Sequence, residues 1–183
     1  MRKWVFFWVV SAVGVTLDLF TKFLADTRLP LGRPVDIVGA KVQLLLVHNK
    51  AAVFGLDPRH LIPGFPLNLV FLIFSVLAVI ILLVYYHRLP SGERLTRWGI
   101  ALIMPGALGN MFDRVMHPQR GVVDFIKVGI SEEVYWPIFN FADIYVTVGV
   151  GLVLLVFVRE EMSRGRHNEA ASSPARSDGS PDG

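Results

Sequence analysis

Two aspartates occupy positions that favour hydrolytic chemistry. Asp124 lies in the polar stretch "MHPQRGVVDFIKVGISEEVYWPIFN", and Asp143 lies at the start of the long apolar run that follows it. Two carboxylates held close together do not ionise independently, because one pKa rises and the pair shares a proton. Such a pair can activate a water on one side and protonate a leaving nitrogen on the other, with pKa values that belong to the pair. The two residues therefore favour amide hydrolysis without a metal or a covalent nucleophile.

Other polar residues that are unusual in apolar surroundings lie near one end of the apolar runs. They are Asp18, Lys22, Asn110, Asp113 and Arg114, with Asn49 in a connecting loop. Polar and ionisable residues within membrane spans are usually functional or paired with one another. If the chain crosses a membrane four times, these residues all fall at the outer interface, at the same depth as Asp124 and Asp143. This convergence favours one functional site.

Each of these residues also has a purely structural interpretation. Asp18 and Lys22 are four residues apart and can form an ion pair on one helix face. Asp113 and Arg114 can form an ordinary charge pair at the interface, and Asn110 can hydrogen-bond to a neighbouring helix. Taken singly, none of them indicates catalysis.

The two aspartates have structural interpretations as well. Asp124 can cap a turn, and Asp143 can act as a helix N-terminal acid that interacts favourably with the helix dipole. The argument for chemistry therefore depends on the two carboxylates lying close together.

Several other kinds of site are excluded or disfavoured. The absence of cysteine excludes disulfides, thiolate metal sites and a Cys nucleophile. No metal or other cofactor is expected, since the spacing of the histidines matches no metal motif; they include His48, His60, His87 and His117. Neither a G-x-S-x-G motif nor a Walker A loop is present. The net charge of +3 is too small to indicate a nucleic-acid partner.

The elements that must position these residues are membrane spans. The chain is 53% hydrophobic and 18% charged, which is typical of membrane proteins. A helix needs about 17–25 apolar residues to cross the hydrocarbon core. Four runs meet this requirement, although the third contains Pro105, Asn110 and three glycines: Trp4 to Leu24, Leu67 to Tyr86, Trp98 to Val115, and Phe141 to Val158. The predicted fold class is an all-α polytopic membrane protein with four transmembrane helices.

The distribution of positive charge predicts the orientation. Short cytoplasmic loops carry an excess of Lys and Arg. Three regions fall on one side of a four-span protein and carry Arg2, Lys3, Arg88, Arg94, Arg97, Arg159, Arg164 and Arg166. Both termini are therefore expected in the cytoplasm. The first run resembles a secretory signal peptide, but it ends in Asp18 and Lys22 without a cleavage site, which favours a retained span.

The two outer loops, 26–66 and 116–140, carry strand-like segments. "VDIVG" and "VQLLLVHN" predict a hairpin or small sheet in the first loop, and residues 122–128 are strand-like in the second. A small extracytoplasmic β-sheet is therefore expected above the helices. Residues 1–164 are predicted to form the membrane domain, and residues 165–183 are predicted to form a disordered cytoplasmic tail because they contain no large apolar residue.

Five sequence segments, in order, resemble the motifs of the lipoprotein signal peptidases, also called signal peptidase II. The match covers the chain from Trp4 to about Arg159, and the last three segments together are highly specific. The segments are "DLFTK" (Asp18 to Lys22), "NKAAVFG" (Asn49 to Gly55), "PGALGNMFDR" (Pro105 to Arg114), "VVDFI" (Val122 to Ile126) and "FNFAD" (Phe139 to Asp143).

This resemblance implies an aspartic endopeptidase of the bacterial inner membrane that cleaves prolipoproteins just before a diacylglyceryl-modified cysteine. It implies that Asp124 and Asp143 are the catalytic residues, that Asp18 and Lys22 form a supporting pair, and that no metal is used. Residues that line or support the site would be Asn49, Phe54, Gly109, Asn110, Asp113, Arg114, Asn140 and Ala142. The implied partners are the lipidated substrate and membrane lipid, and the expected state is a monomer.

Three positions depart from the family pattern. Ala51 stands where the family usually has Gly, Val53 where it usually has Ala, and Pro105 replaces the first Gly of the third motif. The first two would narrow the space around Asn49. Pro105 is expected to kink the third span or to end its regular hydrogen bonding one turn early.

Two other classes of function remain as alternatives. In a small proton- or ion-coupled carrier, Asp18, Lys22 and Asp143 would form an ion path. However, carriers place such groups near the bilayer midplane, and these lie toward one face. An interaction subunit without chemistry would leave the pairing of Asp124 and Asp143 unexplained.

Overall fold

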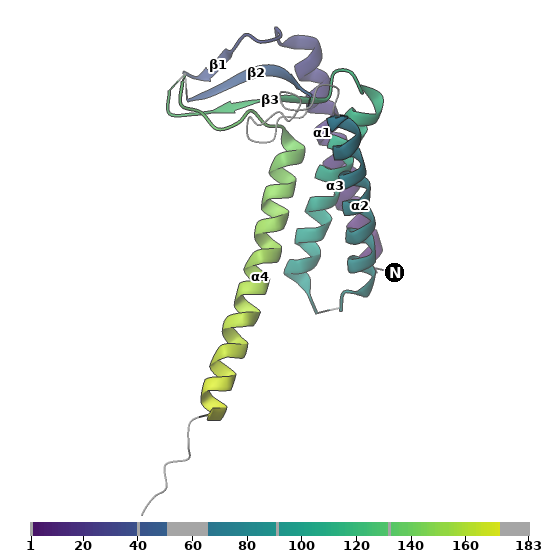
Figure 1. Ribbon diagram of the computed structural model, residues 1–183, viewed down its shortest axis with the longest axis vertical. Helices are drawn as coiled ribbons and strands as arrows, with labels where there is room; N and C mark the ends of the chain where they lie inside the picture. The colour runs from purple at the N-terminus through teal and green to yellow at the C-terminus, as the bar shows by residue number, and fades with distance from the viewer. Residues whose placement is uncertain (1, 40, 51–65, 91, 132, 173–183) are drawn as a thin grey trace, which may run out of the picture.

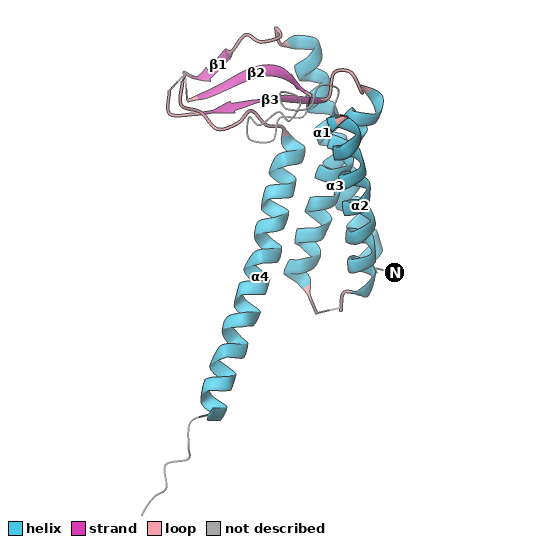
Figure 2. Ribbon diagram, in the orientation of Figure 1, coloured by secondary structure: helices cyan, strands magenta, loops and turns pink. Residues whose placement is uncertain are grey.

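Among the residues that the structure describes, four long helices and a three-stranded sheet make up the fold (Figures 1 and 2). The computed structural model describes residues 2–39, 41–50, 66–90, 92–131 and 133–172. The sheet lies across one end of the helices, and α4 extends beyond the others at the opposite end (Figure 1). The helices are α1 (Arg2–Arg28), α2 (Leu67–Arg88), α3 (Arg94–Met116) and α4 (Phe141–Ser172).

Three of these helices are long and apolar enough to cross a membrane. The segments are Lys3–Arg28, Leu67–Arg88 and Phe141–Arg166. The helix α3 has 23 residues but does not qualify by the same measure of apolarity, and its middle is rich in glycine. The structure therefore has the predicted four helices, of which three are recognisable as spans from their composition.

The helix α3 packs against α1, α2 and α4 and is the central helix of the bundle. Small residues allow the close approach. A Cβ on Gly99 would lie 2.8 Å from the backbone oxygen of Gly149, and a Cβ on Gly106 would collide with the backbone oxygen of Ala142. Small residues at such positions are typical of helix contacts in membranes.

Pro105 does not end the third helix, which continues to Met116. Of the two expectations for Pro105, an early end of the regular helix is wrong, and a kink stays a prediction. The proline is buried, and a Cβ on Gly14 of α1 would lie only 2.7 Å from its ring. The ring thus fills space that the glycine leaves open, which gives Pro105 a packing role between α1 and α3.

The sheet confirms the strand predictions in both outer loops. Its order is β1-β2-β3, and both pairings are antiparallel. In β2–β3, Val47 pairs with Asp124 and Asn49 pairs with Val122. The strands are β1 (Val35–Val38), β2 (Val42–Asn49) and β3 (Val122–Val128).

A small apolar cluster fixes the sheet to the helices. The buried side chains of Leu46, Val123 and Phe125 contact Ala25 of α1, and Phe141 at the start of α4 packs against the same cluster. Burial of these side chains provides the main stabilising free energy for this contact. The sheet is therefore held directly above the ends of α1 and α4.

The helix α4 ends later than the sequence predicted. The predicted span ended at Val158 and disorder was expected from residue 165, but the helix continues to Ser172. Residues 159–172 are mostly good helix formers, including Arg, Glu, Met and Ala, so the helix can persist beyond the apolar segment. Residues 173–183 lie outside the described part of the chain.

Candidate active site

Asp143 is held in place by a capping arrangement at the start of α4. The side-chain oxygen Oδ1 of Asn140 accepts a hydrogen bond from the backbone N–H of Asp143 at 3.1 Å. In return, the backbone N–H of Asn140 donates to Asp143 Oδ2 at 3.0 Å. This is the reciprocal pattern of a capping box. It fixes the Asp143 carboxylate at the level where the helix begins.

Asp124 is placed by the alternation of strand β3. Its neighbours Val123 and Phe125 belong to the apolar cluster, so the Asp124 side chain points to the opposite face of the strand. This carboxyl group is buried, with 3% of the residue exposed. Asn140 Nδ2 donates to its Oδ1 at 2.7 Å, and Asn49 Nδ2 donates to its Oδ2 at 2.9 Å.

One asparagine therefore contacts both aspartates. The amide of Asn140 donates to Asp124, while its backbone N–H donates to Asp143. Asn140 is itself fully buried, so its hydrogen bonds are made with little competition from water. The proximity of the two aspartates, which the sequence analysis required for chemistry, is built into the start of one helix.

The environment of Asp124 favours its protonated form. Burial, which penalises the charged carboxylate, and the negative charge of Asp143 raise the pKa of Asp124 to about 7. Hydrogen bonds from Asn49 and Asn140 and the charge of Lys22 act in the opposite direction without cancelling this effect. Near neutral pH, Asp124 is thus poised to hold and release a proton.

Beside the two aspartates lies an ion-paired cluster centred on Lys22. Its Nζ lies 2.8 Å from Asp18 Oδ2, which is the ion pair predicted from the i,i+4 spacing. It also lies 3.0 Å from Asp113 Oδ2. All three side chains are nearly inaccessible. The ammonium group therefore pairs with two buried carboxylates from different helices.

Lys22 also determines how the Asn110 amide is oriented. Lys22 Nζ donates to Asn110 Oδ1 at 2.9 Å, which leaves Asn110 Nδ2 to donate to Asp143 Oδ1 at 3.0 Å. An ammonium group can only donate, so the amide oxygen must face it. Asn140 Nδ2 donates to the same Asn110 oxygen at 3.1 Å. Asn110 thereby links the ion-paired cluster to the aspartate pair.

Gly109 and Ala142 bring the backbone close to Asp18. A Cβ on Gly109 would collide with Asp18 Oδ2. The backbone N–H of Ala142 donates to Asp18 Oδ1 at 2.9 Å, and this satisfies one of the N–H groups that a helix start leaves unpaired. Both residues therefore support the site through backbone positions.

Arg114 does not pair with Asp113, contrary to one of the structural interpretations of the sequence. Its Nη1 donates to the backbone oxygen of Asn110 at 3.0 Å, and its guanidinium lies over the ring of Phe71 at 5.3 Å. Asn68 Nδ2 donates to the Arg114 backbone oxygen at 3.1 Å. Asn68 and Phe71 were not predicted, because contacts between α2 and α3 leave no local signal in the sequence.

The first outer loop is described only as far as Lys50. Asn49 lies at the predicted site, as its contact with Asp124 shows. Phe54, and the departures Ala51 and Val53, lie outside the described residues.

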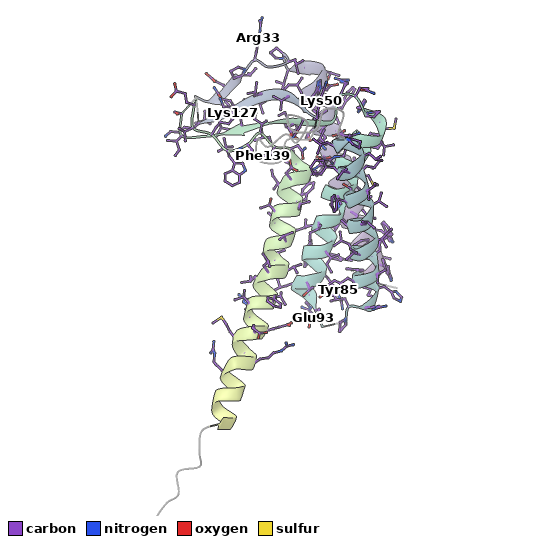
Figure 3. The ribbon with its side chains drawn as sticks, viewed as in Figure 1. Arg33, Lys50, Tyr85, Glu93, Lys127 and Phe139 are labelled. Atoms are coloured by element: carbon purple, nitrogen blue, oxygen red, sulfur yellow. The ribbon has the colours of Figure 1, made fainter. Side chains whose placement is uncertain are left out.

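An apolar pocket opens beside Asp143. Its volume is about 470 Å³, and it is lined by Val128, Trp136, Phe139, Asp143, Ile144, Thr147 and Val148. Phe139 lies where α4 meets the sheet, at the end of the molecule opposite Tyr85 and Glu93 (Figure 3). The pocket can therefore accommodate an apolar group with a carboxylate at its edge.

The described residues include no group of three or more His, Cys, Asp or Glu side chains suited to a metal ion. The two carboxyl groups themselves are suited to proton transfer. One carboxyl group is poised near neutral pH, the other is held within the same hydrogen-bond network, and both lie at the edge of the helical bundle beneath the sheet.

Comparisons with known proteins agree with the motifs. The family described as "Signal peptidase (SPase) II" matches residues 10–159. A protein of Symbiobacterium thermophilum named "Lipoprotein signal peptidase" is 39% identical over 153 residues, which cover 84% of this chain and 94% of that protein. One of the same name from Geobacillus kaustophilus is 35% identical, with 84% and 90% covered.

Solved structures show the same fold. One, described as "Bacterial membrane enzyme structure by the in meso method at 2.3 A resolution", has a TM-score of 0.72 and 25% identity. The similarity covers 85% of this chain and 88% of that one. A second, described in the same words at 1.9 A, has a TM-score of 0.69 and 26% identity, with 82% and 91% covered.

Proposed function

The chain belongs to the signal peptidase II family, and on that premise we propose that it is an aspartic endopeptidase that removes signal peptides from bacterial prolipoproteins. The bond cleaved is the one before the diacylglyceryl-modified cysteine. The observation that carries the proposal is the hydrogen bonding of Asp124 and Asp143 to one residue, Asn140. This arrangement brings two carboxyl groups together without a metal ligand set among the described residues.

The raised pKa of Asp124 supports a mechanism in which that residue holds the starting proton. Asp124 then donates a hydrogen bond to the carbonyl oxygen of the scissile amide, and Asp143 accepts a proton from the attacking water. As the C–O bond forms, the Asp124 proton moves to the carbonyl oxygen and gives a neutral gem-diol.

Collapse of this intermediate restores the enzyme. Asp143 gives its newly acquired proton to the amide nitrogen, the C–N bond breaks, and Asp124 takes back a proton from one hydroxyl group of the diol. The products are a carboxylic acid and an amine, and the pair ends with one proton, as it began. Both residues act as acid and base in turn, which is the behaviour of a pair that shares one proton.

The apolar pocket beside Asp143 supports a lipid-bearing substrate. Its lining combines aromatic and aliphatic side chains with one carboxylate. An acyl chain of the substrate would lie against the apolar lining and bring the adjacent peptide bond to Asp143. The binding free energy of the lipid would thus be used to position the reacting bond.

We place the site at the outer leaflet interface. Asp18, Lys22, Asn110 and Asp113 lie near the same ends of α1 and α3, and Asp143 lies in the first turn of α4. This position at one end differs from the midplane location expected in a carrier. The Lys and Arg residues near the opposite helix ends put those ends in the cytoplasm, with both termini.

In this arrangement α3 also crosses the membrane, which brings the number of spans to four. A helix of 23 residues is about 34 Å long, enough for a hydrocarbon core of about 30 Å. Contacts with the other three helices shield its polar and small residues from lipid, so it does not need an apolar surface all round. The enzyme acts on its lipidated substrate as a monomer.

The test is cleavage of a defined substrate in detergent. The purified wild type and Asp143→Asn are mixed with a diacylglyceryl-modified prolipoprotein and with an unlipidated copy, and cleavage is followed on a gel. Cleavage of the lipidated substrate alone, lost in the variant, is expected. Absence of cleavage by a folded wild type would contradict the proposed activity, and equal cleavage of both substrates would contradict the role of the lipid.

A further inference from the structure

Three side chains outside the proposed catalytic network form a second polar cluster, which we call the outer clamp. It consists of Asp26 in the last turn of α1, His48 in β2, and Arg120 in the turn before β3. Asp26 Oδ1 lies 2.8 Å from His48 Nε2 and 2.7 Å from Arg120 Nη2. Arg120 Nη2 and His48 Nε2 are 3.0 Å apart. One carboxylate thus joins three segments that are far apart in the sequence.

The outer clamp is next to a close backbone contact. His48 precedes Asn49, and Arg120 precedes Gly121. Gly121 has a φ of +80°, a conformation that favours glycine, and a Cβ there would collide with the backbone oxygen of Asn49. Asn49 also pairs with Val122 across the two strands. The clamp therefore joins His48 and Arg120, and the residues that follow them, Asn49 and Gly121, are in close contact.

Strand alternation separates the clamp from the reacting groups. Successive residues of a strand point to opposite faces, so His48 and Asn49 project in opposite directions. His48 contacts Asp26, while the Asn49 amide donates to Asp124 Oδ2 at 2.9 Å. The clamp can therefore act on Asp124 through the backbone and side chain of Asn49.

We propose that Asp26, His48 and Arg120 are positioning residues that hold the Asn49 amide on the catalytic carboxyl group of Asp124. This inference rests on the proposed function for its kinetic consequence. Without the clamp, the ends of β2 and the turn before β3 separate, and the hydrogen bond from Asn49 is weakened. The donor on Asp124 that comes from the first outer loop is then lost, while the donor from Asn140 remains.

Loss of the Asn49 hydrogen bond should change the pKa of Asp124 in a defined direction. A hydrogen bond donated to a carboxylate favours its charged form, and the bond from Asn49 lowers the pKa of Asp124. Opening the clamp should therefore raise that pKa further. The charges of Asp143 and Lys22 also act on Asp124, and both residues are retained in the variants used below.

The pH dependence of kcat tests the proposal with two clamp variants. Arg120→Gln changes a side chain that is 48% exposed, so the fold should be retained, and Asp26→Asn removes the shared carboxylate. Both should lower kcat roughly tenfold with little change in KM, and both should shift the alkaline limb upward by about half a pH unit. Asp36→Asn is the matched control. Asp36 also accepts a 2.7 Å hydrogen bond, but from Gln43 in the β1–β2 pairing and not within the clamp. This variant should behave as wild type.

A double variant distinguishes positioning from general stability. Asn49→Ala should itself shift the alkaline limb upward, and adding Arg120→Gln to it should cause no further shift. An additive shift in the double variant, or a wild-type profile in both clamp variants, would overturn the proposal. Since the wild type serves as the reference in the same assay, its cleavage of the lipidated substrate separates failure of this inference from failure of the proposed function.

Discussion

Two pairs of aspartates lie side by side in the protein and have different hydrogen-bond partners, and of the four only Asp143 is partly exposed. Asp18 and Asp113 share the ammonium group of Lys22, at 2.8 and 3.0 Å. Asp124 and Asp143 are instead held by amide and backbone N–H donors from Asn49, Asn110 and Asn140. A cation in contact with a carboxylate favours its charged form strongly, and neutral amide donors favour the charged form less.

The difference indicates a division of labour. The Lys22 cluster joins α1 and α3 through two ion pairs, and removing the ammonium group leaves two buried carboxyl groups without their cation. The amide-held pair retains a carboxyl group whose pKa is raised to about 7, which is useful for acid–base chemistry and of little use for stability. Substitutions in the first pair should therefore affect folding, and substitutions in the second should affect rate.

The largest expected effect is on rate, in the amide-held pair. Asp124→Asn and Asp143→Asn each remove a proton acceptor while keeping nearly the same shape. We expect cleavage to fall by about 10⁴-fold or more, by analogy with the loss of other essential acid–base groups. Thermal unfolding in detergent should change by only a few degrees. A variant that keeps a tenth of wild-type activity would remove that residue from the mechanism.

The next effect is on stability, in the ion-paired cluster. Lys22→Met leaves Asp18 and Asp113 buried without their cation, which should destabilise the protein by about 3–5 kcal/mol. Thermal or denaturant unfolding in detergent measures this change, with exposed Lys41→Met as the control. Replacing both aspartates by Asn in the Lys22→Met background should restore part of the loss. A Lys22→Met protein as stable as wild type would contradict the division of labour.

Asn140 is expected to affect both stability and rate, and two substitutions separate the two effects. Asn140→Ala removes the cap of α4 and the amide donor, so it should cost about 1 kcal/mol of stability and roughly 100-fold in kcat. Asn140→Ser keeps an oxygen that can accept from the Asp143 N–H. It should therefore retain most of the stability and lose a similar factor in kcat. Recovery of activity in Asn140→Ser would show that the cap alone matters.

The last predicted effect is on stability alone and comes from a glycine beside the ion-paired cluster. Gly109→Ala adds a Cβ that collides with Asp18 Oδ2, and the required shift should cost about 1–3 kcal/mol. Gly151→Ala is the matched control, since a Cβ there meets no atom within 4 Å and should change stability by less than about 0.5 kcal/mol. Equal unfolding temperatures for the two variants would show that the backbone near Asp18 is not tightly packed.

Local patterns predicted the local contacts. The i,i+4 spacing indicated the ion pair of Asp18 and Lys22, and the strand-like segments became the sheet. The N-x-x-D spacing of Asn140 and Asp143 also carried a capping signal, in addition to the dipole effect expected for Asp143. Such contacts depend on residues within one turn, so their signal is present in the order of the residues.

Contacts between distant segments could not be predicted in the same way. Asp113 pairs with Lys22 of another helix and not with its neighbour Arg114, because helix packing places these groups together. The outer clamp joins segments 94 residues apart. Hydropathy likewise marked the apolar part of α4 but not its end at Ser172. The residues after the apolar part are mostly good helix formers although they are polar.

The most direct test of the central claim is the titration of the Asp124 carboxyl group. Infrared spectroscopy of protein labelled with ¹³C-aspartate, compared with Asp124→Asn, isolates the band of the protonated acid. In wild type this band should disappear as the pH rises through about 7, and in Asp143→Asn it should disappear at lower pH because the neighbouring negative charge is gone. An Asp124 that titrates near pH 4, the ordinary value for a carboxyl group, in both proteins would contradict the shared-proton pair.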